Sequence, residues 1–181
     1  MPRMSILNSV EREAFESPPL FNSVQRKQYL DFPSALRRLA AGLRSATHQL
    51  GFLLSGGYFK ATKRFFPPST FRPRDIEYVA HELGLSDPTF DPTDYSERTR
   101  QRHACMIREF YGFRAFDEDA RQLLLEEIVG MVRSQIKPKL MLWRCVDALV
   151  REKIELPSYT RLTKIILGAI NRRKNESHDR H

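Results

Sequence analysis

The chain has 181 residues, of which 30 are Lys or Arg and 22 are Asp or Glu, so its formal net charge at pH 7 is +8. This length suits one domain or two small ones, and the basic balance favours a polyanionic partner, nucleic acid before a membrane surface. No apolar run approaches the length of a membrane span and the N-terminus has no hydrophobic signal segment, so we expect a cytoplasmic protein without a membrane partner.

Residues 1–30 predict two short helical segments. A helix follows Asn8, because Glu11 stands at the spacing that closes a capping box with it. The Ser-Pro-Pro sequence at 17–19 ends this helix, since Pro cannot continue it. A further turn or helix is predicted over 21–29.

Two longer helices are predicted next. Asp31, just before Phe32-Pro33, is expected to cap a helix that runs through Leu43, because Pro suits a first turn. The nearly uncharged sequence ATHQLGFLLSGGYF at 46–59 predicts a buried helix whose Gly residues permit close packing at a cost in helix propensity. Three cations lie outside the apolar face of the first of these helices, namely Arg37, Arg38 and Arg44.

The loop over 60–73 combines basic, aromatic and Pro residues. Its Lys63 and Arg64 are candidate contacts to a phosphate backbone, and a purely connecting surface loop is an equal alternative. A helix is then predicted over 73–84, with Pro at its start and Gly at its end. Residues 87–94 separate it from the next helix by more than a helix-turn-helix motif normally allows.

The stretch 95–116, YSERTRQRHACMIREFYGFRAF, has a helical period. Its apolar positions are expected to face a core, among them Ala104, Ile107, Phe110 and Tyr111. Arg100 and His103 fall on the same half of the helix, where they either project past the core or are buried and paired. The opposite face carries a stripe at i, i+3, i+4 and i+7, formed by Arg98, Gln101, Arg102 and Cys105.

This stripe predicts contact with a negatively charged groove, because Arg binds phosphate or guanine edges through a rigid fork of donors. We expect Arg98 and Arg102, with Gln101 between them, to contact DNA, and Arg108 to contact a phosphate. The alternative is a solvated helix face whose arginines pair with Glu97, Glu109 or Asp94.

The last third of the chain predicts helices that begin at Asp117 and Lys139, and a final helix over 159–174 that Ser158 caps after a tight ELPS turn. This arrangement is a second helix-turn-helix candidate. The outer face of the final helix is polar and basic and supplies further candidate DNA contacts, namely Thr160, Arg161, Lys164 and Arg172.

These patterns predict an all-α fold of about seven or eight helices with helix-turn-helix-like DNA-binding units. Residues 1–88 would form an N-terminal helical subdomain and 89–181 a second one, with one unit as the alternative. The five histidines are scattered and Cys105 and Cys145 lack metal-ligand spacing. We therefore expect no catalytic residue, metal, cofactor or small-molecule ligand.

Four segments in order resemble one protein family: MPRMSILNSVERE, HQLGFLLSGGYFK, YSERTRQRHACMIREFYGFRAF and REKIELPSYTRLTKII. They are similar to the N-terminal region of the large transposases of the Tn-three family of replicative bacterial transposons. The resemblance implies a helical region that binds the terminal inverted repeats in double-stranded DNA. It also implies that magnesium-dependent cutting and joining belong to a C-terminal Asp-Asp-Glu domain that this chain lacks. SGGYFKATKRFFPP departs from the family's pattern.

Two hypotheses follow for the function. The first is a sequence-specific double-stranded DNA-binding module. The second is a protein-interaction or dimerisation module of a transposase assembly, whose charge is incidental and whose self-association would depend on apolar contacts.

Overall fold

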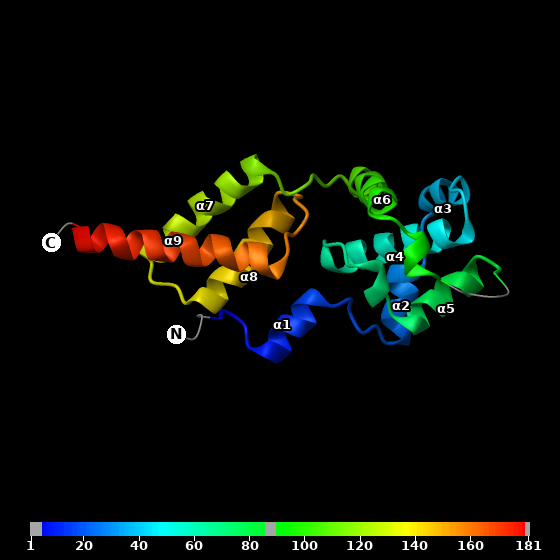
Figure 1. Ribbon diagram of the computed structural model, residues 1–181, viewed down its shortest axis with the longest axis horizontal. Coiled ribbons are helices and arrows are strands. Elements are labelled where there is room, and N and C mark those ends of the chain that lie inside the picture. The colour runs from blue at the N-terminus through cyan, green and yellow to red at the C-terminus, as the bar shows by residue number, and fades with distance from the viewer. Residues whose placement is uncertain (1–4, 86–89, 180–181) are drawn as a thin grey trace. The chain divides into compact units, whose positions relative to one another are not determined.

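The computed structural model describes residues 5–85 and 90–179, and within them the fold is all-α, as predicted (Figure 1). The described residues form nine α-helices and two short 3-10 helices, Pro68–Thr70 and Pro92–Asp94, so the expected number of helices was close. A single isolated bridge, between Arg114 and Ile154, is the β pairing seen in this part of the chain. No helix among the described residues is both long and apolar enough to cross a membrane.

The chain divides into two compact units, Ser17–Phe113 and Met1–Glu16 with Arg114–His181. The boundary predicted after residue 88 lies outside the described residues. The observed division differs from the predicted one because the helix over Glu97–Tyr111 packs on a helix of the first half. The N-terminal segment joins the second unit, where the Tyr159 hydroxyl accepts a hydrogen bond from the Leu7 N–H at 3.0 Å.

The unit Ser17–Phe113 is built around α4, Ala46–Thr62, in which every residue from Leu50 to Phe59 is buried. Figure 1 shows α3 (Ser34–Ala41) and α6 (Glu97–Tyr111) on one side of α4, and α2 (Ser23–Leu30) and α5 (Pro73–Glu82) on the other. All four helices contact α4. The predicted buried helix is therefore the centre of this unit.

A buried ion pair fastens α2 and α5 to α4. Asp75 of α5 is 1% exposed and accepts hydrogen bonds from the Tyr58 hydroxyl at 2.5 Å and from Arg26 Nε at 2.8 Å. A buried carboxylate needs such partners, because its charge is otherwise costly to remove from water. Burial and the Asp75 carboxylate raise the pKa of the Tyr58 hydroxyl, so it remains a donor.

The start of α3 differs from the prediction. Asp31 does not cap this helix, because the residue at the cap position is Pro33 and no side chain accepts a hydrogen bond there. Asp31 instead ends α2, and its carboxylate lies 3.1 Å from Arg37 Nη2. Leu39 is 41% exposed because it lies at the edge of the buried face formed by Leu36 and Ala40.

The second unit consists of α1 (Ser9–Glu16), α7 (Glu118–Arg133), α8 (Pro138–Arg151) and α9 (Tyr159–Asp179). The predicted capping box of α1 is present, since Asn8 and Glu11 exchange hydrogen bonds at 2.8 and 3.2 Å. The helices pack around a core whose fully buried members include Leu124, Ile128, Leu142, Leu149, Leu162 and Ile166.

Candidate nucleic-acid interface

Local sequence signals set both ends of α6. The Ser96 hydroxyl accepts a hydrogen bond from the Thr99 N–H at 3.2 Å, which caps the first turn. Gly112 ends the helix with φ +72°, a left-handed conformation that Gly adopts without a steric cost. α6 therefore covers Glu97–Tyr111, within the stretch 95–116 for which the sequence predicted a helical period.

The buried face of α6 follows the predicted period. Ile107 and His103 are fully buried and Ala104 is 9% exposed, and α6 contacts α4. A Cβ built on Gly51 of α4 would lie 2.5 Å from Cε2 of Tyr95, the residue just ahead of α6. Only Gly leaves room for the Tyr95 ring at this position, which explains one of the small residues of α4.

His103 is buried and paired, which was one of the two alternatives. Its Nδ1 lies 2.5 Å from the Tyr95 hydroxyl, and its ring packs edge-on against Phe52 at 5.3 Å between centroids. Burial, then the nearby Arg102 and His48 charges, lower the pKa of His103 to about 4, so the imidazole is neutral at pH 7. Arg100 stays half-buried at the edge of the core, 3.4 Å from Glu97.

The opposite face of α6 exposes the predicted stripe, Arg98, Gln101, Arg102 and Cys105. Glu97 binds Arg100 and Gln101, each at 3.4 Å. Neither Arg98 nor Arg102 has an ion-pair partner among the described residues. Arg108, one turn further on, is half-buried and interacts with other residues of the chain. Arg98 and Arg102 therefore present two guanidinium groups to solvent.

The two candidate side chains of the basic loop after α4 contact other residues of the protein. Arg64 is only 7% exposed and its guanidinium lies 5.8 Å from the centroid of the Phe66 ring. Lys63 ends α4 with φ +63°, and its Nζ donates to the Lys60 carbonyl at 2.6 Å. Both side chains are engaged by the protein, which favours the connecting-loop alternative, and Arg64 is too buried to reach a phosphate.

The second set of candidates lies on α9, in the other unit. Thr160, Arg161, Lys164 and Arg172 are all exposed. Arg161 stacks over the Phe116 ring at 4.7 Å, so its guanidinium is partly occupied by a cation–π contact. Lys164 has no ion-pair partner among the described residues. The predicted DNA-contacting residues are thus divided between the two units.

The connection between α8 and α9 is longer than the predicted ELPS turn. It covers residues 152–158, because α8 ends at Arg151 and Ile154 pairs with Arg114 in the isolated bridge. Lys153 turns the chain with φ +55°. Ser158 then accepts a hydrogen bond from the Arg161 N–H at 3.2 Å, so its predicted capping role is confirmed. A standard helix-turn-helix turn is shorter.

Two further cations are exposed in the same unit, Arg38 of α3 and Arg44 in the turn that follows it, and neither is among the predicted DNA contacts. Only their position outside an apolar face was visible in the sequence. In the described parts of the chain, no three His, Cys, Asp or Glu side chains gather in an arrangement that could hold a metal ion.

Comparison with known proteins gives two matches. Residues 6–169 match the sequence model of a family described as a domain of unknown function, DUF4158. Over 176 residues, 95% of this chain, the sequence is 24% identical to the transposase for transposon Tn3926 of Escherichia coli. The matched region is the N-terminal part of that protein, and the chain spans 17% of its length. The predicted resemblance to the N-terminal region of such a transposase is confirmed.

Proposed function

The chain belongs to the DUF4158 family, and from this premise we propose that it binds double-stranded DNA and recognises the terminal inverted repeats of a transposon as the N-terminal part of a transposase. The similarity to the N-terminal part of the Tn3926 transposase supports this proposal. Cutting and joining of DNA, and the magnesium they need, would then belong to the part of the transposase that this chain does not match.

The observation that carries the proposal is the pair of exposed guanidinium groups on α6. Arg98 and Arg102 lie one helical turn apart, on the face opposite the buried Ile107. α6 has 15 residues, and at 1.5 Å per residue it is roughly 22 Å long. A helix with its side chains is about 10–12 Å wide and the major groove is about 12 Å wide, so such a helix fits the groove.

The position of the pair along α6 supports the role that we propose for each arginine. Both arginines lie in the first half of the helix, and recognition helices contact base edges with their N-terminal residues. We therefore place at least one of them on a guanine edge, where an Arg fork discriminates by about 1–3 kcal/mol. Arg108 lies in the last turn and is assigned to a phosphate.

The test begins with selection of binding sites from a pool of random-sequence duplexes, followed by affinity measurements on the selected duplex and on a scrambled duplex. Arg102→Ala should reduce the ratio of the affinity for the selected duplex to the affinity for the scrambled duplex. Arg108→Ala should lower both affinities and reduce the salt slope by about one. Arg74→Ala removes an exposed charge on α5, outside the proposed surface, and should leave both affinities unchanged.

The proposal fails if no sequence is enriched. The assignment of α6 fails if Arg102→Ala retains the full preference of the parent chain. Melting temperatures of the same variants separate lost contacts from lost folding, because arginines that only fasten the helix would lower the melting temperature and leave the preference intact.

A second candidate function, association with another protein, is favoured by apolar side chains exposed on α8. Leu140 is 48% exposed and Trp143 is 43% exposed, and they lie one turn apart. DNA binding through about six phosphates loses roughly a thousandfold in affinity between 50 and 200 mM salt. Apolar association scarcely responds to salt, so a salt series decides which function the chain performs.

A further inference from the structure

α3 and α6 both pack on α4, on the same side of it (Figure 1). A Cβ built on Gly56 of α4 would lie 3.5 Å from Leu36 Cδ2 of α3 and 3.9 Å from Ile107 Cδ1 of α6. The two apolar side chains therefore converge over one residue of α4. Since α3 and α6 bury these faces against α4, they turn their opposite faces to solvent on the same side of the unit.

The solvent face of α3 carries a cation that the protein leaves unpaired. Arg38 follows Leu36 by two residues, which places it about 200° around the helix from that buried side chain, and it is exposed. It has no ion-pair partner among the described residues, in contrast to Arg37, which lies 3.1 Å from Asp31. Arg38 thus keeps its full donor set for a ligand.

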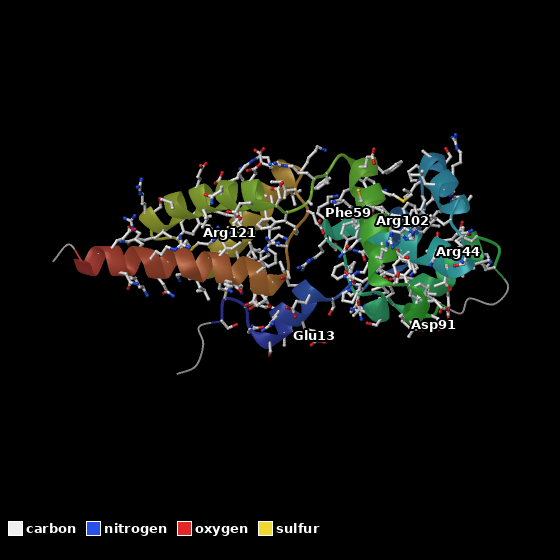
Figure 2. The ribbon with its side chains drawn as sticks, turned by 45° about the horizontal axis from the view of Figure 1, so that its top comes forward. Glu13, Arg44, Phe59, Asp91, Arg102 and Arg121 are labelled. Carbon is white, nitrogen blue, oxygen red and sulfur yellow. The ribbon has the colours of Figure 1, made fainter. Side chains whose placement is uncertain are left out.

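Arg44 lies in the turn between α3 and α4 and is exposed too, with no ion pair among the described residues. The next residue, Ser45, caps α4, and the ring of His48 in the first turn of α4 lies 6.0 Å from the ring of His103 on α6. The turn with Arg44 is therefore near the first half of α6, where Arg102 lies. Figure 2 labels both arginines, on these neighbouring elements.

The opposite side of the unit, formed by α2 and α5, is less basic. Two of its arginines serve the fold, because Arg26 pairs with Asp75 and Arg72 Nη2 donates to the Pro18 carbonyl at 2.8 Å. Its exposed residues include two acids, Glu77 and Glu82. Exposed cations without an ion pair among the described residues number four on the α3 and α6 side, Arg38, Arg44, Arg98 and Arg102, against two on the α2 and α5 side, Lys27 and Arg74.

The geometry of the major groove determines what α3 would contact if α6 occupied the groove. The major groove is about 12 Å wide and is bordered on both sides by the phosphate backbones. A helix beside one that occupies the groove therefore passes over the phosphates at the edge of that groove, as the first helix of a helix-turn-helix does. We propose that Arg38 and Arg44 hold the phosphate backbone of double-stranded DNA beside α6. This inference rests on the proposed function and adds a backbone clamp to it.

The experiment measures the affinity of the full chain for a mixed-sequence duplex and for the selected duplex over a range of salt concentrations. The double variant Arg38→Ala/Arg44→Ala should reduce the salt slope by about 1.8, since each phosphate contact contributes about 0.9. Both affinities should fall by the same factor, because phosphate contacts carry no sequence information. The matched control, Lys27→Ala/Arg74→Ala, removes the same charge from α2 and α5 and should keep the parental slope.

The inference is overturned if the salt slope of the affinity is the same for Arg38→Ala/Arg44→Ala as for the control variant. In that case the proposed function still stands, provided that the parent chain prefers the selected duplex. If the parent chain binds all duplexes equally, the proposed sequence recognition is overturned. The salt slopes on mixed-sequence DNA still decide the role of Arg38 and Arg44. A chain that binds no duplex overturns both. Equal melting temperatures of the two double variants show that the charges, and not the fold, were changed.

Discussion

The hydroxyl oxygen of Tyr95 lies 2.5 Å from Nδ1 of His103, so the residue ahead of α6 is bonded to the buried face of that helix two turns later. The Tyr95 ring also fills the space over Gly51 of α4. These contacts hold the first half of α6, which carries Arg98 and Arg102, against the centre of the unit. The orientation of the proposed DNA-binding face thus depends on a small buried cluster.

Substitution of two glycines of α4 should have opposite effects on stability. Gly51→Ala places a methyl group 2.5 Å from a Tyr95 ring that His103 holds in place, so we expect a loss of about 1–3 kcal/mol from overpacking. Gly56→Ala meets Leu36 at an ordinary 3.5 Å, and should stabilise the helix by up to about 1 kcal/mol through its higher propensity. Urea unfolding of both variants measures the change in the free energy of unfolding. If both variants were destabilised by the same amount, this packing would be contradicted.

His103 should make the stability of the chain depend on pH. Its folded pKa of about 4 lies below its ordinary value of 6.5, so the unfolded chain binds more protons between these two values. The free energy of unfolding should therefore fall as the pH is lowered from about 6.5 towards 4, by an amount on the order of 2–3 kcal/mol from this group. Urea titrations at several pH values measure it.

The comparison variant His103→Gln should lose this component of the pH dependence, whatever its absolute stability. His81→Gln removes an exposed histidine of α5 and should keep the parental dependence. If the free energy of unfolding of His103→Gln depends on pH as strongly as that of the parent chain, another group causes the effect.

Binding of DNA should protect Cys105 from alkylation. This thiol is exposed on the stripe with Arg98 and Arg102, whereas Cys145 is fully buried and burial raises the pKa of its thiol to about 12. Maleimide near neutral pH should thus modify Cys105 alone, because the thiolate is the reactive form. A saturating duplex should slow this reaction severalfold, as measured by intact mass.

The control for this footprint is the variant Cys105→Ala/Lys27→Cys, which moves the exposed thiol to α2. Its alkylation rate should not change when the duplex is added. Unchanged alkylation of Cys105 in the presence of bound DNA would place the interface away from α6.

Charge reversal on α9 tests whether the second unit contacts DNA. Lys164→Glu should weaken binding to both selected and scrambled duplexes, since it places a carboxylate where we expect a phosphate. The melting temperature should change little, because the side chain is exposed and surface substitutions are usually within about 0.5 kcal/mol. Lys137→Glu, at an exposed position of the same unit, is the matched control, and equal affinities for these two variants would leave α9 as a packing element.

The sequence alone was sufficient for the all-α class and for several helix ends, because their signals lie within a few residues of one another. The capping box of Asn8 with Glu11, the Pro and Gly that bound α5, and the terminal Gly112 of α6 are all local. The helical period likewise separated the buried Ile107 from the exposed stripe of α6.

Only the tertiary structure decided which helices share a surface and which cations remain available on it. Leu36 and Ile107 converge on Gly56 although they are far apart in the sequence, so α3 and α6 share one side of α4. Arg64 is buried despite its place in a basic loop. Lateral packing depends on the fit between side chains from distant segments, and a period or a cap within one helix contains no information about its neighbour.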